Sequence, residues 1–156
     1  MFYSIYIDAP RHFIKDGRSV DALALDSFIG RAFVAEHSGV VTEDDAKKII
    51  TKAREIDPLS EKRILIKGDA EVSAEAASVF LLSGVLLLGC ESQSVGPQDA
   101  PMAVHIALLS AGVVLLEGIR LSEVSEGAYF LNAAPLNLFG ADGAPCRAVL
   151  METDSF

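Results

Sequence analysis

The chain has 156 residues, of which 51% are apolar, and a formal net charge of −9 from 13 basic and 22 acidic side chains. This length suits one domain that buries its own core, and the apolar content argues against disorder. An acidic chain without a basic stripe is not typical of proteins that bind nucleic acid or anionic membranes.

The first third of the chain predicts two strands followed by a helix. In Tyr3–Ile7, apolar and polar residues alternate weakly and most residues favour β-strands, which predicts a first strand. Asp8–Pro10 ends this strand, because proline cannot continue a β-ladder. Arg31–Glu36 predicts a second strand. Thr42 is typical of a helix N-cap, since acids follow it in the first turn, and the helix is expected to stop at Asp57-Pro58.

The rest of the chain predicts helices that alternate with apolar strands. Ser73 caps a helix over about 74–83, which ends at Gly84, and the apolar Val85–Leu88 is typical of a strand buried on both faces. This alternation indicates an α/β domain with buried parallel or mixed strands. The other predicted elements are a loop at Glu91–Pro97, a helix from about Gln98 or Ala100 to Ser110, strands at Arg63–Lys67, Val113–Leu116, Tyr129–Ala133 and Arg147–Met151, and a turn at Gly140–Pro145.

The N-terminus, the apolar runs and the cysteines indicate an intracellular protein. Met1–Ile5 has no basic region and no long apolar run, so no signal peptide is expected. Val79–Cys90 and Val104–Leu116 are shorter than the ~20 residues that span a bilayer. Cys90 and Cys146 make no disulfide framework and are expected to be buried thiols in a cytoplasmic protein.

The first candidate site combines a carboxylate and an imidazole. Asp8 leaves the end of the predicted first strand, and His12 follows four residues later, which suits placing both groups in one cleft. The alternative is that Asp8 caps the turn and His12 is a surface side chain. His37 sits in a predicted turn without an acid or base pattern around it, so we expect it to be solvated.

A second candidate site lies near the end of a buried strand. His105 falls on the predicted helix that precedes Val113–Leu116, and Glu117 directly follows this strand, at the edge where ligand sites of α/β sheets gather. The alternative is that Glu117 marks the point where the strand meets water. The polar Glu91–Pro97 segment is expected either to line a pocket or to be a connecting loop.

Together these segments resemble the cyclase family, which includes bacterial kynurenine formamidase (arylformamidase). The family carries the motif H-x-G-T-H-x-D-x-P-x-H-F, and this chain matches the second half of it. Later in the family sequence, P-x-x-x-H on a helix is followed by G-V-V-x-x-E. The corresponding His and Glu of this chain are 12 residues apart. The matching segments are Ile7–Phe13, Gly89–Val95, Pro101–His105, Gly112–Glu117, Ala134–Leu136, Gly140–Pro145 and Arg147–Leu150.

The resemblance implies a metal-dependent amide hydrolase with a small-molecule substrate. Asp8, His105 and Glu117 would bind zinc or manganese, more plausibly one ion than two, and His12 would transfer the proton. The implied fold is a swivelling β/β/α domain over residues 1–156, with a mixed, partly barrel-like sheet flanked by helices, usually as a homodimer or homotetramer. The substrate pocket is expected at Phe13, Glu91, Gln93 and Ser94.

The chain also departs from the family pattern. The two leading histidines of the motif fall at Phe2 and Tyr6, and its Gly-Thr falls at Ser4-Ile5. The family's N-terminal strands before the motif are expected to be missing, because the sequence begins inside the motif. Two hypotheses therefore stand: a hydrolase of altered activity, or an inactive relative that acts as a binding or structural subunit.

Overall fold

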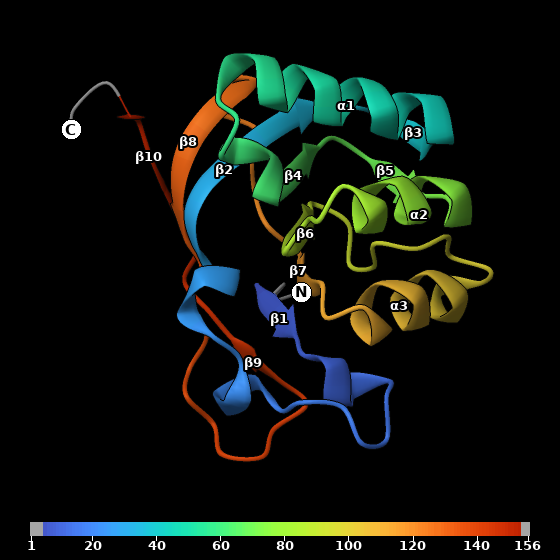
Figure 1. Ribbon diagram of the computed structural model, residues 1–156, viewed down its shortest axis with the longest axis vertical. Helices are drawn as coiled ribbons and strands as arrows, with labels where there is room; N and C mark the ends of the chain where they lie inside the picture. Colours follow the sequence, from blue (N-terminus) through green and yellow to red (C-terminus); the bar gives the residue numbers. More distant parts are fainter. Residues whose placement is uncertain (1–4, 154–156) are drawn as a thin grey trace.

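The computed structural model describes residues 5–153, apart from the side chain of Pro101, and folds them into a curled sheet with helices on one face (Figure 1). The expectations for Phe2 and Ser4 fall outside the described residues. In chain order, the helices α1, α2 and α3 lie side by side over the sheet in Figure 1. Their bounds are Glu43–Ile56 for α1, Ala74–Leu82 for α2 and Pro101–Ser110 for α3.

The main sheet has the strand order β10-β8-β2-β4-β6-β7-β1-β9. β2, β4, β6 and β7 run parallel to one another, whereas β1, β8, β9 and β10 pair antiparallel with their neighbours. This arrangement confirms the predicted α/β class with a mixed sheet. The strands are β1 (Tyr6–Asp8), β2 (Ile29–Glu36), β4 (Arg63–Lys67), β6 (Leu87–Cys90), β7 (Val114–Glu117), β8 (Gly127–Asn132), β9 (Gly143–Pro145) and β10 (Val149–Met151).

Smaller elements connect these strands and helices. β3 (Gly39–Val41) and β5 (Ala70–Val72) form a separate parallel pair that leads into α1 and α2. Short 3-10 helices lie at Pro10–His12 (η1), Val20–Ala22 (η2), Leu25–Ser27 (η3) and Ser60–Lys62 (η4).

The sheet curls because one segment supplies both of its edges. β9 pairs with β1 and β10 pairs with β8, yet only residues 146–148 separate β9 from β10. Cys146 continues both ladders: its N–H donates to the Ile5 carbonyl over 3.2 Å, and it forms a bridge with Pro135 beyond β8. Residues 143–151 therefore join the two ends of the sheet, and the expected partly barrel-like shape is confirmed.

Alternate residues of the central strands point into two separate cores. Ile64 and Leu115 face the helices, whereas their neighbours Leu65 and Leu116 face the inside of the curl, and all four are fully buried. Burying each such side chain stabilises the fold by about 1.5–3 kcal/mol. Because of this alternation, the residue after Leu116 returns to the helix side, where the candidate site lies.

Local sequence signals fix the ends of the helices. Thr42 and Asp45 form a reciprocal capping box at the start of α1, and the Ser73 hydroxyl accepts from the Ala76 N–H at the start of α2. α3 follows directly after Ala100 with Pro101 as its first residue, and the turn beyond its end contains Gly112 at φ +82°. The predicted helix positions are confirmed to within a few residues.

The structure corrects two expectations about strands and adds two short strands. Residues Gly143–Pro145 of the expected Gly140–Pro145 turn form β9, because Gly143 lets the backbone approach β1 closely. The strand expected at Val85–Leu88 begins only at Leu87, since the Val85 N–H still bonds to the Phe80 carbonyl behind α2. β3 and β5 were not predicted, because three-residue strands carry little periodicity.

Within residues 5–153 no helix is both long and apolar enough to cross a membrane.

Candidate metal centre

Asp8 is held on the helix side of β1. It lies opposite Leu115 of β7 and Gly143 of β9, and paired residues of an antiparallel ladder point to the same face. Leu115 belongs to the helix-side core, so Asp8 also points towards the helices, and its side chain is only 5% exposed. A buried carboxylate at this position needs a charged or polar partner.

Glu117 provides the second carboxylate at the end of β7. It lies opposite Tyr6 of β1 and Cys90 of β6, which places it on the same face as Asp8. Its Oε1 atom accepts a hydrogen bond of 2.9 Å from the Val95 N–H. The loop after β6 therefore orients this carboxylate from above the sheet.

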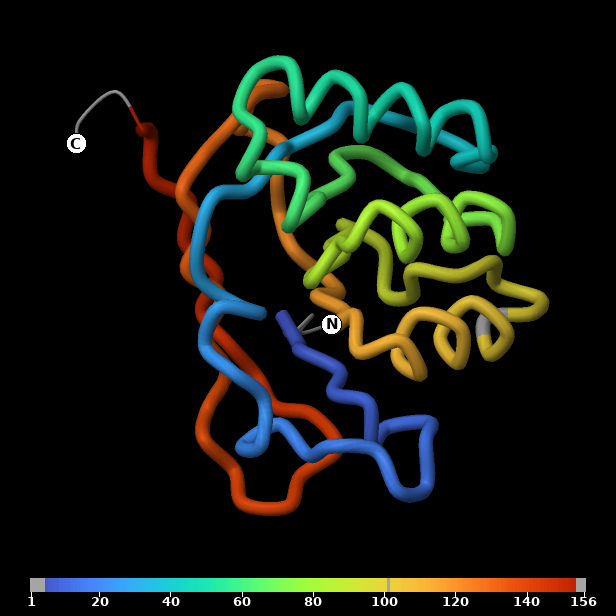
Figure 2. The backbone as a smooth tube through the Cα atoms, in the orientation of Figure 1, coloured from blue at the N-terminus to red at the C-terminus, as the bar shows by residue number. Residues whose placement is uncertain are grey.

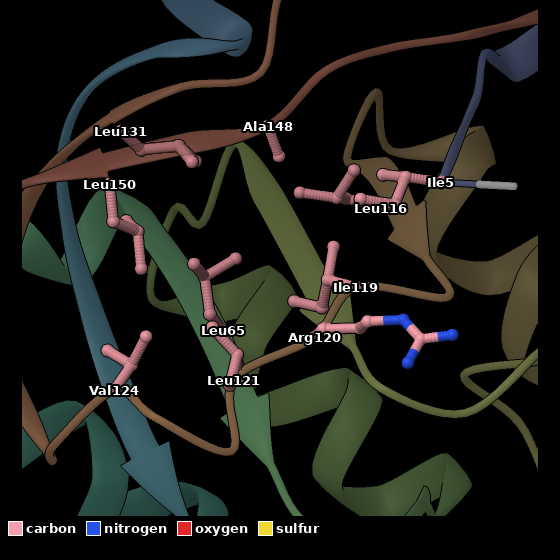
Figure 3. A pocket seen from close by; sticks show the side chains of 10 residues that line it. All are labelled: Ile5, Leu65, Leu116, Ile119, Arg120, Leu121, Val124, Leu131, Ala148 and Leu150. Atoms are coloured by element: carbon pink, nitrogen blue, oxygen red, sulfur yellow. The ribbon is translucent and has the colours of Figure 1, made fainter.

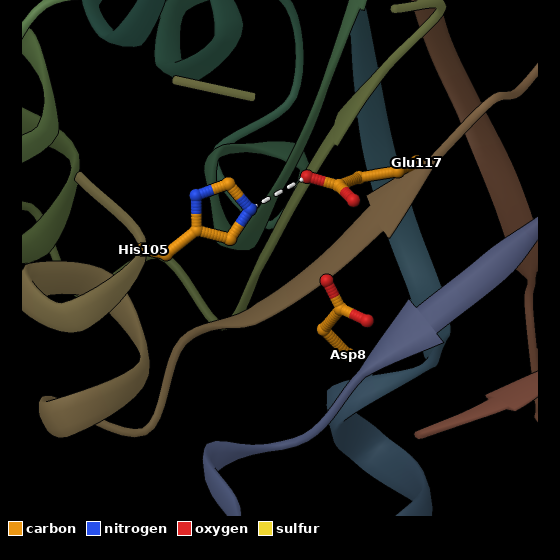
Figure 4. Close-up of side chains that lie close together, drawn as sticks. All are labelled: Asp8, His105 and Glu117. Atoms are coloured by element: carbon orange, nitrogen blue, oxygen red, sulfur yellow. Dashed lines mark hydrogen bonds and ion pairs between the residues drawn. The ribbon is translucent and has the colours of Figure 1, made fainter. Parts of the chain in front are cut away.

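His105 faces Glu117 from α3. Its Nε2 atom lies 2.9 Å from Oε1 of Glu117, and its side chain is 5% exposed (Figure 4). α3 packs Val104 and Leu108 into the helix-side core, and this packing carries His105 towards the sheet. Figure 4 shows the Asp8 carboxyl group directed towards Glu117 from β1.

These three residues form a compact cluster that suits a divalent cation. One ligand atom each from Asp8, His105 and Glu117 lies within 4.8 Å of the other two. Burial, and after it the charge of Glu117, raise the pKa of the Asp8 carboxyl to about 6. A divalent cation would offset this repulsion, and a set of two carboxylates and one imidazole fits zinc or manganese. The structure thus brings together the three predicted ligands.

His12 lies beside this cluster, at the end of η1. Its Nδ1 atom is 2.8 Å from Oδ2 of Asp142, and about a third of its side chain is exposed. A positive charge on His12 lowers the pKa of Asp8, which opposes the effects of burial and of Glu117. The predicted proton-transfer residue therefore acts electrostatically on the cluster and keeps access to solvent.

Phe13 lies between His12 and His105 of the three-residue cluster. Its ring meets the His12 ring edge-on at a centroid distance of 4.7 Å, and it lies 5.2 Å from the His105 ring. Phe13 is half-buried and packs against the helix-side core. It thus lies beside both imidazoles, and a contact with substrate remains a prediction.

The other residues expected in the substrate pocket have different surroundings. Both carboxylate oxygens of Glu91 accept backbone hydrogen bonds of 2.7 Å, one from Gly68 and one from Leu121. Gln93 is exposed and lines a hollow of about 290 Å³ together with Glu91. Ser94 donates to the Gly96 carbonyl over 3.5 Å. Glu91 thus holds two loops together, and a substrate contact for any of these three residues remains a prediction.

Tyr6 occupies the position of one leading family histidine. It lies opposite Glu117, and burial, with the nearby Asp142 and Asp8 carboxylates, raises the pKa of its phenol. A phenol is an uncommon metal ligand, unlike the imidazole that the family motif has at this position.

Sequence reasoning missed Asp142, which is the hydrogen-bond partner of His12. It falls in the segment that was expected to be only a turn. The one available signal was an acid directly before Gly143, in a segment that resembles the family's end.

An apolar hollow of about 360 Å³ opens on the other face of the sheet (Figure 3). Leu65 and Leu116 point into it from inside the curl, and Arg120 is the charged residue of its lining. Because Glu117 faces the helices, the sheet separates this hollow from the cluster of Asp8, His105 and Glu117. Its lining is Ile5, Leu65, Leu116, Ile119, Arg120, Leu121, Val124, Leu131, Ala148 and Leu150.

Comparison with known proteins identifies the family of this chain. The family model described as putative cyclase matches residues 4–97, more than half of the chain. The chain belongs to the cyclase family. It is 36% identical over 162 residues to kynurenine formamidase of Salinibacter ruber, covering 94% of this chain and 74% of that protein. It is 34% identical over 155 residues to kynurenine formamidase of Erythrobacter litoralis, covering 93% of this chain and 70% of that protein.

Solved structures share the cyclase-family fold. A potential metal-dependent hydrolase with cyclase activity superposes with a TM-score of 0.81 at 27% identity, over 94% of this chain and 77% of that chain. Isatin hydrolase A from Ralstonia solanacearum gives a TM-score of 0.79 at 20% identity, over 95% and 71% of the two chains. The second likeness bears on the fold alone. The expected swivelling β/β/α architecture is therefore confirmed.

Proposed function

We propose that this cyclase-family chain is a metal-dependent amide hydrolase of the kynurenine formamidase type. The observation that carries the proposal is the convergence of Asp8, His105 and Glu117 within 4.8 Å on the helix side of the sheet. The similarity to kynurenine formamidases supports an amide as substrate. A potential metal-dependent hydrolase among the similar structures supports the metal.

Asp8, His105 and Glu117 would hold one zinc or manganese ion. A divalent cation at such a site acidifies a bound water and polarises the carbonyl of the substrate. Glu117 is oriented by the Val95 N–H and His105 by the packing of α3, so two of the three ligands are fixed before any cation arrives. Such preorganisation favours binding because little side-chain freedom is lost.

His12 would move the proton during hydrolysis. It takes a proton from the attacking water as the new C–O bond forms, and gives it to the amine nitrogen as the C–N bond breaks. Phe13 lies between the His12 and His105 rings and would shield one side of the reacting group from water. Phe13 is also the pocket residue best placed to contact an aromatic substrate.

The substrate class that fits this proposal is a small formamide, or a cyclic amide or ester. N-formylkynurenine, from tryptophan catabolism, is the substrate suggested by the names of the similar enzymes. We further propose a single domain that acts in the cytoplasm as a homodimer or homotetramer. Light scattering after size-exclusion chromatography would give the mass of the assembly.

A second candidate function is a catalytically inactive relative that serves as a binding or structural subunit. The observation that favours it is Tyr6, whose phenol stands where the family motif has a histidine. Phe2, at the other histidine position, cannot bind a metal. An inactive relative would retain the fold, and turnover would be absent even when the protein is loaded with metal.

Hydrolysis assays separate these two functions. Protein reconstituted with zinc or manganese is tested for release of formate from N-formylkynurenine, and for ring opening of isatin as a cyclic amide. We expect metal-dependent turnover that falls about 100-fold or more in Glu117→Gln. Glu123→Gln, which removes an exposed carboxylate elsewhere, should leave it unchanged. Metal binding without turnover would favour the inactive relative, and absence of metal binding would contradict the hydrolase.

A further inference from the structure

We infer that Asp142 is a positioning residue that fixes the tautomer and orientation of His12. Its Oδ2 atom lies 2.8 Å from Nδ1 of His12, and within residues 5–153 this is the one hydrogen bond that the His12 ring makes. The inference deepens the proposed function and rests on it, because a hydrolase needs His12 in a defined protonation state. The two residues are 130 positions apart in the chain, so only the fold brings them together.

Backbone hydrogen bonds fix Asp142 relative to Asp8, one of the proposed metal ligands. Its carbonyl oxygen accepts a hydrogen bond of 2.9 Å from the Ala9 N–H, directly after Asp8. The next residue, Gly143, lies opposite Asp8 in the β1–β9 ladder. Asp142 therefore extends the ladder that carries one of the proposed ligands, and its carboxylate projects from a strand end whose position β1 sets.

The loop before Asp142 is held by the segment that carries His12. The Ala141 carbonyl accepts from the Val20 N–H over 2.9 Å. The Gly140 N–H donates to Oδ1 of Asp21 over 3.0 Å, and Nη1 of Arg11 donates to the Gly140 carbonyl over 3.3 Å. Figure 2 shows these two segments running together at the end of the molecule away from α1. Both partners of the His12–Asp142 pair thus sit on backbone that is cross-linked several times.

A role in stability does not account for this pair. The side chains of His12 and Asp142 are 36% and 55% exposed, and ion pairs at such positions contribute only about 0–1 kcal/mol. The chemical consequence is larger. A carboxylate oxygen only accepts, so Nδ1 of His12 must carry the proton, and the lone pair of the neutral ring is then on Nε2.

This arrangement prepares His12 for the proposed proton transfer. Nε2 accepts the proton of the attacking water, and the resulting imidazolium is stabilised by the Asp142 carboxylate at Nδ1. Nε2 then returns the proton to the leaving amine, which restores the starting tautomer. Phe13 holds the other side of the ring through its edge-on contact. Asp142 acts only through His12 and needs no contact with the substrate.

Nitrogen NMR of the metal-free protein tests the tautomer directly. The signals of His12 are assigned with His12→Gln and recorded at neutral pH in the wild type, in Asp142→Ala and in Asp21→Ala. Asp21→Ala is the matched control, because it removes the other carboxylate that holds the same loop. We expect protonated Nδ1 in the wild type and in Asp21→Ala, and a mixture of tautomers in Asp142→Ala. An unchanged tautomer in Asp142→Ala would overturn the inference.

Kinetics with substrates of different leaving groups give a second readout. For N-formylanilines, Asp142→Ala should lower kcat by about 100-fold when the aniline is a poor leaving group, and by much less when it is a good one. KM and the bound metal should stay unchanged. Equal losses for all substrates, or the same losses in Asp21→Ala, would assign Asp142 a merely structural role. If the wild type shows no turnover, the proposed function fails, while the tautomer experiment still decides the role of Asp142.

Discussion

The Asp8 carboxyl is kept from water on the helix side of β1 and faces Glu117. Burial and the Glu117 charge raise its pKa from 3.8 to about 6. The folded chain therefore binds the proton of the Asp8 carboxyl more tightly than the unfolded chain does. The stability that the proton contributes is present below about pH 4 and is lost as the pH rises through about 6. The metal-free protein therefore carries an electrostatic cost at neutral pH.

Replacing Asp8 by Asn should remove this cost. We expect the metal-free Asp8→Asn protein to gain stability relative to the wild type between pH 4 and pH 7, on the order of 2 kcal/mol. Urea denaturation with a chelator at both pH values measures the difference. A difference between the two proteins that does not change with pH would contradict the raised pKa.

Tyr6 allows the missing family ligand to be restored. Because Tyr6 lies opposite Glu117, Tyr6→His places an imidazole on the ladder that carries Asp8, and imidazole nitrogen is a good zinc ligand. We expect zinc affinity to rise at least about tenfold in titration calorimetry. Tyr6→Phe is the control, and it should bind as the wild type does. Weaker binding by Tyr6→Phe would instead make the phenol a ligand.

The residue types and their spacing singled out the members of the candidate site, and the resemblance to the cyclase family joined them into one set of metal ligands. Asp8, His105 and Glu117 follow strand ends or lie on a helix next to one, and such positions are visible in the sequence. Asp142 was missed because its role depends on a contact with His12 across most of the chain. Glu91 looked like a pocket residue, but its backbone partners, Gly68 and Leu121, come from two other loops that the sequence does not bring together.

At the scale of elements, β9 determines how the site is assembled. It lies at the edge beside β1, and Asp142 directly precedes it. A Cβ atom at Gly143 would lie 2.5 Å from the Ile7 carbonyl oxygen, which is too close for any side chain. The same glycine, with Gly140 and Pro145, made the segment 140–145 look like a turn, so local propensity gave the wrong element for residues 143–145. By contrast, α1 was predicted because Thr42 and Asp45 form a local capping box.

Gly143→Ala should therefore damage both stability and metal binding. The methyl group forces β9 away from β1, and we expect a loss of about 1–3 kcal/mol and weaker zinc binding. Gly39→Ala is the matched control: its φ of +82° makes alanine costly, but the site is far away and the space around it is open. Denaturation and zinc titration of both variants measure the two effects. Equal zinc affinity in both would show that β9 does not shape the site.

At the scale of the whole molecule, one continuous segment, residues 143–151, curls the sheet. The mixed α/β class was predictable from apolar strands alternating with helices, because that pattern is local. The curling was expected only through the resemblance to the cyclase family, since it depends on Cys146 pairing with both Ile5 and Pro135, a contact that no local pattern shows. The curl leaves the apolar hollow inside and the Asp8–His105–Glu117 cluster outside, so the sheet separates an apolar cavity from a cluster of charged and polar side chains.

Metal titration calorimetry tests the central claim most directly. Chelated and dialysed protein is titrated with zinc or manganese, as wild type, Glu117→Gln, His105→Ala and Glu123→Gln. The account predicts one cation per chain for the wild type and for Glu123→Gln, and binding at least about tenfold weaker in the other two. No binding by the wild type, or equal binding by all four proteins, would contradict a metal centre formed by Asp8, His105 and Glu117.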